Sequence, residues 1–98
     1  MDTYLPIGSV VLLRGGKKKI MIYGRKQRTL DTGEEWDYLA CPYPEGFLDQ
    51  KHVYVFNHEQ IETVCFLGFH DNEDAALVEK LNSLSDETEA IRSVKEFQ

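Results

Sequence analysis

Residues 9–23 have the sequence SVVLLRGGKKKIMIY, in which two apolar runs flank a pair of glycines. The β-branched and apolar content of residues 9–14 predicts a strand, and residues 18–23 predict a second one. Gly15 and Gly16 favour a tight turn between them, because glycine adopts positive φ without a clash at Cβ. Both runs are apolar at adjacent positions, which predicts strands covered on both faces, as in a small closed barrel.

Three further strands are predicted downstream, at residues 36–41, 52–56 and 61–67. Residues 25–35 are polar and contain glycine, so we expect a long exposed loop or a flared hairpin tip. Pro42 and Pro44 should end the third strand because proline cannot donate to a ladder. Asn57 can cap a single helical turn at residues 57–60. Five short strands with this turn before the last suggest a mainly β, SH3-like barrel, with an open, curled antiparallel sheet as the alternative.

The composition changes after Gly68, which divides the chain into a barrel-like part at residues 1–70 and a helical segment at residues 71–98. Asn72 should cap a helix whose first turn is acidic. The apolar stripe expected to pack on the barrel consists of Leu77, Val78, Leu81 and Leu84. A second segment, residues 86–97, has too thin a stripe to be stable alone, so we expect it to be partly mobile or to order on a partner.

Length and composition predict one folded domain of 98 residues, since 42% of them are hydrophobic. No apolar run is long enough to span a membrane, and the first residues lack the pattern of an export signal, so we expect a soluble, cytoplasmic protein. Cys41 and Cys65 lie in apolar, strand-like surroundings. We expect both to be free, buried thiols, because disulfides are unusual in a reducing cytosol.

The net charge of -6 hides a strong asymmetry along the chain. Residues 1–28 contain seven basic side chains and one acidic one, whereas acidic side chains predominate in the remainder. Such blocks are either solvated faces or surfaces that steer a partner of opposite charge.

Catalytic and metal-binding patterns are absent from the sequence. The histidines at 52, 58 and 70 form no zinc motif with the cysteines, and His58 beside Glu59 is better explained as a solvated or capping residue. Gly15, Gly16 and Lys17 lack the spacing and the following helix of a phosphate-binding loop. We therefore expect a protein that is not an enzyme and has no cofactor.

The basic residues of the first part could instead bind RNA, as some small barrels do. They lie near Tyr23 and Trp36 in the sequence, and they are Arg14, Lys17, Lys18, Lys19, Arg25, Lys26 and Arg28. The acidic remainder of the chain counts against this alternative, because it repels phosphate.

Four blocks of sequence together resemble a known family: YLPIGSVVLL at 4–13, GGKKK at 15–19, YPEG at 43–46 and FNHEQI at 56–61. The chain resembles a family of short Firmicute proteins of unknown function that are encoded beside type VII secretion toxins of the LXG class. The resemblance covers about residues 4–70. It implies a cytoplasmic accessory to toxin export, a chaperone or adaptor that binds the LXG protein, and it brings no catalytic residues.

An adaptor of this kind needs apolar anchors and a way to attract its partner. The preferred anchors lie in the loop after the third strand, where apolar groups are hard to explain as core, and they are Tyr43, Pro44, Phe47 and Leu48. The alternative is that these residues fold back as a lid on the barrel. The residues expected to steer an acidic partner are Lys17, Lys18, Lys19, Arg25 and Arg28.

Overall fold

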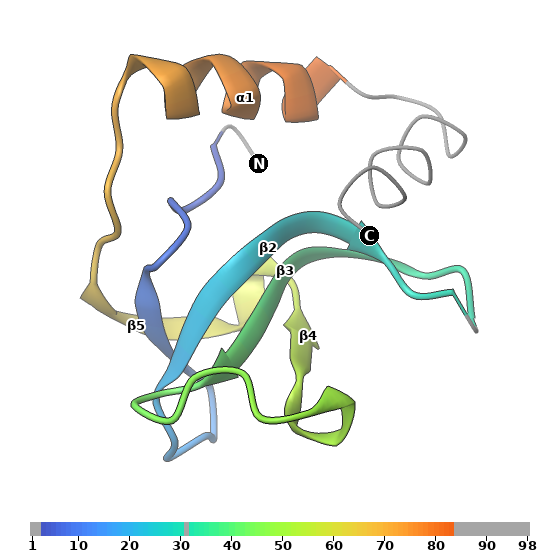
Figure 1. Ribbon diagram of the computed structural model, residues 1–98, viewed down its shortest axis with the longest axis vertical. Helices are drawn as coiled ribbons and strands as arrows, with labels where there is room; N and C mark the ends of the chain where they lie inside the picture. Colours follow the sequence, from blue (N-terminus) through green and yellow to red (C-terminus); the bar gives the residue numbers. More distant parts are fainter. Residues whose placement is uncertain (1–2, 31, 84–98) are drawn as a thin grey trace.

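The structure is a computed structural model that describes residues 3–30 and 32–83 (Figure 1). Five antiparallel strands form one sheet in the order β4-β3-β2-β1-β5. They are β1 Val10–Leu13, β2 Ile20–Arg28, β3 Glu35–Pro42, β4 Tyr54–Phe56 and β5 Ile61–Phe66, with 3-10 turns at Gln50–His52 and His58–Gln60 and the helix α1 at Asn72–Ser83. The prediction of a small, curled, mainly β fold with a helix after the strands is confirmed.

The first hairpin forms where the opening sequence predicted it. Val10 pairs with Met21 and Val11 with Ile20, and Gly15 has the positive φ of 77° that the turn requires. Side chains alternate between the two faces of a strand, so Val11, Ile20 and Ile22 all point inward and are almost completely buried. This hairpin therefore forms the centre of the inner face.

The core lies inside the curl of the sheet and is built around Tyr38. Its ring packs on Phe56 at a centroid distance of 5.3 Å and meets Tyr4 edge-on at 6.0 Å. The Tyr38 hydroxyl accepts a hydrogen bond from the backbone N–H of Leu5 at 3.0 Å and lies 2.7 Å from Nδ1 of His58. These contacts hold the segment before β1 across the inner face of the sheet.

The expected loop at residues 25–35 is shorter than predicted. β2 continues to Arg28 and β3 begins at Glu35, so only residues 29–34 connect them. The pairing shifts between Ile22 and Gly24, and Lys26 adopts a φ of 50°. Such irregularities bend a strand and redirect its side chains, which explains how a polar sequence can continue the sheet while turning Arg25 toward the interior.

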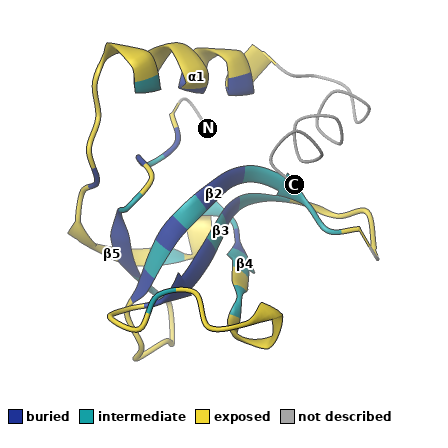
Figure 2. Cartoon of the chain, in the orientation of Figure 1, coloured by how far each residue is buried: buried dark blue, intermediate teal, exposed yellow. Residues whose placement is uncertain are grey.

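Fewer residues of the helix α1 pack on the sheet than the apolar stripe in the sequence predicts. Val78 and Leu81 are buried and join the core cluster, but Leu77 is 41% exposed. Figure 2 shows that most of the helix faces solvent, so one thin stripe suffices at this edge of the molecule. Asp71, not Asn72, caps the helix, since its Oδ1 accepts the backbone N–H of Asp74 at 3.0 Å. Leu84 and the predicted segment 86–97 lie outside the described residues.

The fourth strand is shorter than residues 52–56 because His52 belongs to a 3-10 turn. Asp49 Oδ1 accepts the backbone N–H groups of Lys51 and His52 at 2.9 and 3.1 Å and so holds that turn. The helical turn predicted at residues 57–60 is confirmed, with Asn57 at its N-cap. Across residues 3–30 and 32–83, no helix has the length and apolar character needed to cross a membrane.

Candidate protein-binding surface

A groove of about 410 Å³ lies on the outer face of the sheet. Ile20 and Ile22 point to the core, so Met21 between them points outward in the alternation of β2. Lys19, the residue just before β2, lines the groove as well. The residues lining the groove come from the first hairpin and the residues next to it, from β5 and from the loop after β3, and they are Gly8, Val10, Lys19, Met21, Tyr43, Cys65 and Phe66.

The groove corrects the expectation that both faces of the first two strands are covered, as in a closed barrel. The sheet is open, since β4 and β5 form its two ends and do not pair with each other. The adjacent apolar residues of β1 and β2 therefore have two separate explanations. Val11 and Ile20 form the core, whereas Val10 and Met21 line the groove.

Strand β5 is an edge strand, and all its residues after Ile61 are exposed. Phe66 is 62% exposed, and the chain that follows exposes Leu67 and Phe69 as well. Glu62 is the only charged side chain in the strand. Proteins usually protect edge strands with several charges, a proline or a bulge that turns the edge away from partners. β5 has one charge and no proline, and its pairing with β1 is irregular at two places. The prediction that Cys65 is buried is wrong, because no other part of the described chain covers β5 at this residue. The prediction that Cys41 is buried is confirmed.

The loop after β3 lies beside the groove and is exposed. Tyr43, Phe47 and Leu48 are 42%, 59% and 52% exposed, and Pro44 is exposed too. The backbone N–H of Tyr43 donates to the carbonyl of Lys19 at 2.9 Å, and the Phe47 ring meets Tyr23 edge-on at 6.1 Å. These side chains are exposed and none of them belongs to the core cluster, so the alternative that they plug the barrel as a lid is wrong.

The three lysines of the first hairpin turn lie next to this loop, and all are exposed. Lys18 Nζ is 2.8 Å from a Glu45 carboxylate oxygen, which ties the turn to the loop. The hydrogen bond from Lys18 lowers the pKa of Glu45. The structure thus brings the predicted anchors and the predicted lysines together. We call the groove, β5, residues 43–48 and Lys17 to Lys19 the outer surface.

Arg25 and Arg28 do not belong to the outer surface, contrary to the sequence-based prediction. The Arg25 side chain is only 3% exposed and its Nη2 is 2.7 Å from Oδ1 of Asp74 in α1. Arg28 donates to the Gly33 carbonyl and approaches Glu35 at 3.5 Å within its own hairpin. The sequence predicts an exposed loop for both residues, but β2 extends through Arg28, and the two guanidinium groups pair with Asp74 and Glu35.

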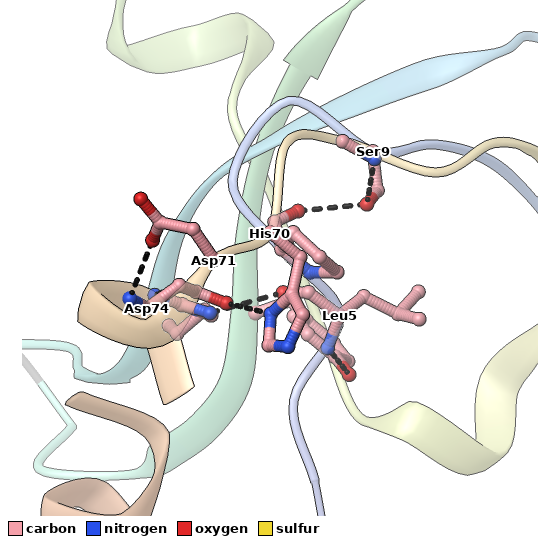
Figure 3. Close-up of polar contacts among 9 residues, drawn as sticks. Leu5, Ser9, His70, Asp71 and Asp74 are labelled. Carbon is pink, nitrogen blue, oxygen red and sulfur yellow. Dashed lines mark hydrogen bonds and ion pairs between the residues drawn. The ribbon is translucent and has the colours of Figure 1, made fainter. Parts of the chain in front are cut away.

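Asp74 joins the helix to the sheet and is held from two sides (Figure 3). Its Oδ2 is 2.7 Å from Nδ1 of His70, and its Oδ1 accepts from Arg25. Burial alone would raise the pKa of the Asp74 carboxyl, but the hydrogen bonds from Arg25 and His70 more than offset it and lower that pKa. This cluster is structural, because it fixes α1 over the segment before β1.

His58 also has a structural contact. Its Nδ1 meets the hydroxyl of buried Tyr38, and its backbone N–H donates to Asp37 Oδ2 at 2.9 Å. Within the described residues, no three His, Cys, Asp or Glu side chains gather as a metal site would require.

The exposed edge of β5 was not foreseen from the sequence, although a signal was present. The segment at 64–69 is VCFLGF, six residues without a charge at the end of the predicted sheet. Its strand character was recognised, but its position at the edge depends on the strand order.

Comparison with known proteins relates most of the chain to one family. A family model described as a domain of unknown function (DUF4176) matches residues 4–77. Neither a curated protein nor a solved structure matches the chain.

Proposed function

We propose that this chain, which belongs to the DUF4176 family of domains of unknown function, is a non-enzymatic adaptor or chaperone that binds a partner protein. The observation that carries the proposal is the outer surface, where an apolar groove adjoins an exposed apolar edge strand and an exposed aromatic loop. Contiguous apolar surface rimmed by polar residues is typical of protein interaction sites.

The partner we propose is a type VII secretion toxin of the LXG class, bound in the cytoplasm. Support for this step comes from the four blocks of sequence that resemble the Firmicute family encoded beside such toxins. The lysines at the rim of the groove would favour an acidic region of that partner and increase the rate of encounter.

The alternative, a nucleic-acid-binding barrel, has less support. It relied on a basic patch that included Arg25 and Arg28, and both side chains contact acidic groups of the chain itself. Lys26 likewise pairs with Glu35, at 3.2 Å, and the other basic residues of the patch, Arg14 and Lys17 to Lys19, belong to a chain whose net charge is -6.

Binding kinetics test the adaptor proposal. The full chain is immobilised, and association and dissociation of an LXG-class protein are followed by surface plasmon resonance at low and high salt. Reversing Lys17, Lys18 and Lys19 to Glu should slow association and flatten its dependence on salt. Phe47→Ala should mainly speed dissociation, by about tenfold if the ring is an anchor.

Leu30→Ala is the matched control for Phe47→Ala, because Leu30 is 74% exposed but lies in the β2–β3 connection and not on the outer surface. It should leave both rates unchanged. Absence of a complex with any LXG-class protein would refute the proposed partner. Copurification of nuclease-sensitive RNA in place of protein would favour the alternative.

A further inference from the structure

The free edge of β5 can accept another strand. β5 pairs with β1 on one side, through Val11 with Val64 and Leu12 with Thr63, and no described strand pairs with its other side. An unpaired edge presents a row of backbone N–H and C=O groups that an extended peptide can pair with. The strand has no proline, and its pairing with β1 shifts register at two places, so an added strand would follow these irregularities along the free edge.

The groove begins at the same edge. Cys65 and Phe66 belong to β5 and also line the groove, whose other walls come from the hairpin β1–β2 and from Tyr43. A strand added to β5 would therefore lie next to the groove. Alternate side chains of an extended segment point to one face, so one of them could enter it.

The positive charge of Lys19 at the groove indicates which kind of peptide segment would bind there. Lys19 is the only charged residue in its lining, and its ammonium has no acidic partner among the described residues. Lys17 is exposed on the same turn. A peptide segment that fits this site would therefore place an apolar side chain in the groove and, a few residues along, a carboxylate that pairs with Lys19.

We propose that β5 binds an extended segment of the partner protein as a sixth strand, with a bulky apolar side chain in the groove and an Asp or Glu beside Lys19. The inference rests on the proposed adaptor function and specifies how the partner is recognised. Main-chain pairing would supply affinity, while the groove and Lys19 would supply specificity.

Peptide selection tests the inference without the natural partner. Random dodecapeptides displayed on phage are selected for binding to the full chain, and the best one is synthesised with a fluorescent label as the probe. We expect selected sequences to share a bulky apolar residue followed closely by Asp or Glu. N-methylation along the probe should weaken binding at every second position, because only alternate N–H groups of an added strand face β5.

Variants of the chain locate the probe. Phe66→Ala should weaken binding about tenfold or more, and Lys19→Glu about two- to fivefold. The matched controls are Phe69→Ala, at a ring that is 80% exposed, and Lys80→Glu, at an exposed lysine of α1 away from the outer surface. Neither residue lines the groove, so both should leave the affinity nearly unchanged.

Three results with the peptide probe would overturn the inference. They are failure to select any peptide, a loss that does not alternate along the N-methylated probe, and equal effects of Phe66→Ala and Phe69→Ala. A dimer of the chain in solution that Phe66→Ala dissociates would identify a second copy as the occupant instead. If the LXG-class partner binds but Phe66→Ala leaves its affinity unchanged, the inference fails and the adaptor function survives. If the probe binds as expected but no partner protein does, the adaptor function fails alone.

Discussion

The junction between β5 and α1 depends on a single glycine. Gly68 is buried where the chain leaves β5 and passes the segment before β1. Its N–H donates to Ser9 Oγ at 2.9 Å, and Ser9 Oγ donates in turn to the Pro6 carbonyl at 2.7 Å (Figure 3). A Cβ at Gly68 would overlap the carbonyl oxygen of Ile7 and lie 2.9 Å from the nitrogen of Ser9. Both atoms belong to the backbone and cannot move aside cheaply.

Gly68→Ala should therefore lower the free energy of unfolding by about 3 kcal/mol, at the upper end of the cost of overpacking. Urea unfolding followed by tryptophan fluorescence measures the effect. Gly16→Ala is the control, because its Cβ would meet Leu13 O at 3.3 Å and should cost about 1 kcal/mol or less. Equal losses of unfolding free energy in both variants would show that the close backbone contact at Gly68 does not cause the destabilisation.

At the level of elements, α1 is attached to the sheet by few but specific contacts. Val78 and Leu81 contribute its apolar contacts to the core cluster, and Asp74 contributes the ion pair with Arg25. Removing one partner of a buried pair leaves an uncompensated charge, whereas replacing both by apolar residues of similar size often costs little. The ion pair therefore fixes where α1 lies on the sheet as well as stabilising the fold.

Asp74→Asn should lower the free energy of unfolding by about 3 kcal/mol, because it leaves the Arg25 guanidinium buried without its anion. The double variant Arg25→Met with Asp74→Leu should recover most of that loss. Thermal unfolding of the two variants and the parent chain makes the comparison. A double variant less stable than Asp74→Asn would contradict this explanation.

For the molecule as a whole, the two faces of the sheet have different roles. The segment before β1 and the helix α1 contribute to the core on the inner face, whereas the outer face carries the groove. The edge strand β5 is largely exposed (Figure 2). The inner face encloses tyrosines in the neutral form. Burial first, and then the charges of Asp37 and Glu35, raise the pKa of Tyr4 to about 12, and burial also raises the pKa of Tyr38.

These tyrosines should make folding sensitive to high pH. The folded-state pKa of Tyr4 lies above the unfolded value of 10.0, so its contribution is fully present below pH 10 and is lost as the pH rises toward 12. The full difference corresponds to about 3 kcal/mol. Urea unfolding between about pH 9 and about pH 11 should show this loss, and it should be smaller in Tyr4→Phe. The same pH dependence in both proteins would exclude Tyr4 as its source.

The sequence by itself determined the parts of the fold that depend on neighbouring residues. The first hairpin follows from two apolar runs around Gly15 and Gly16, and the turn at 57–60 follows from its cap. The loop at 43–48 was also identified correctly as apolar groups outside the strands. Each of these features is local, so composition and period were sufficient to predict it.

Only the tertiary structure decided which face and which edge those elements present. The bend in β2 turns Arg25 away from solvent to meet Asp74, a contact between residues 49 positions apart. The strand order places β5 at an edge, which exposes Cys65 and Phe66, and the open sheet converts Val10 and Met21 into walls of a groove. Burial of a side chain depends on what packs over it, and for these residues that is set by segments distant in the sequence.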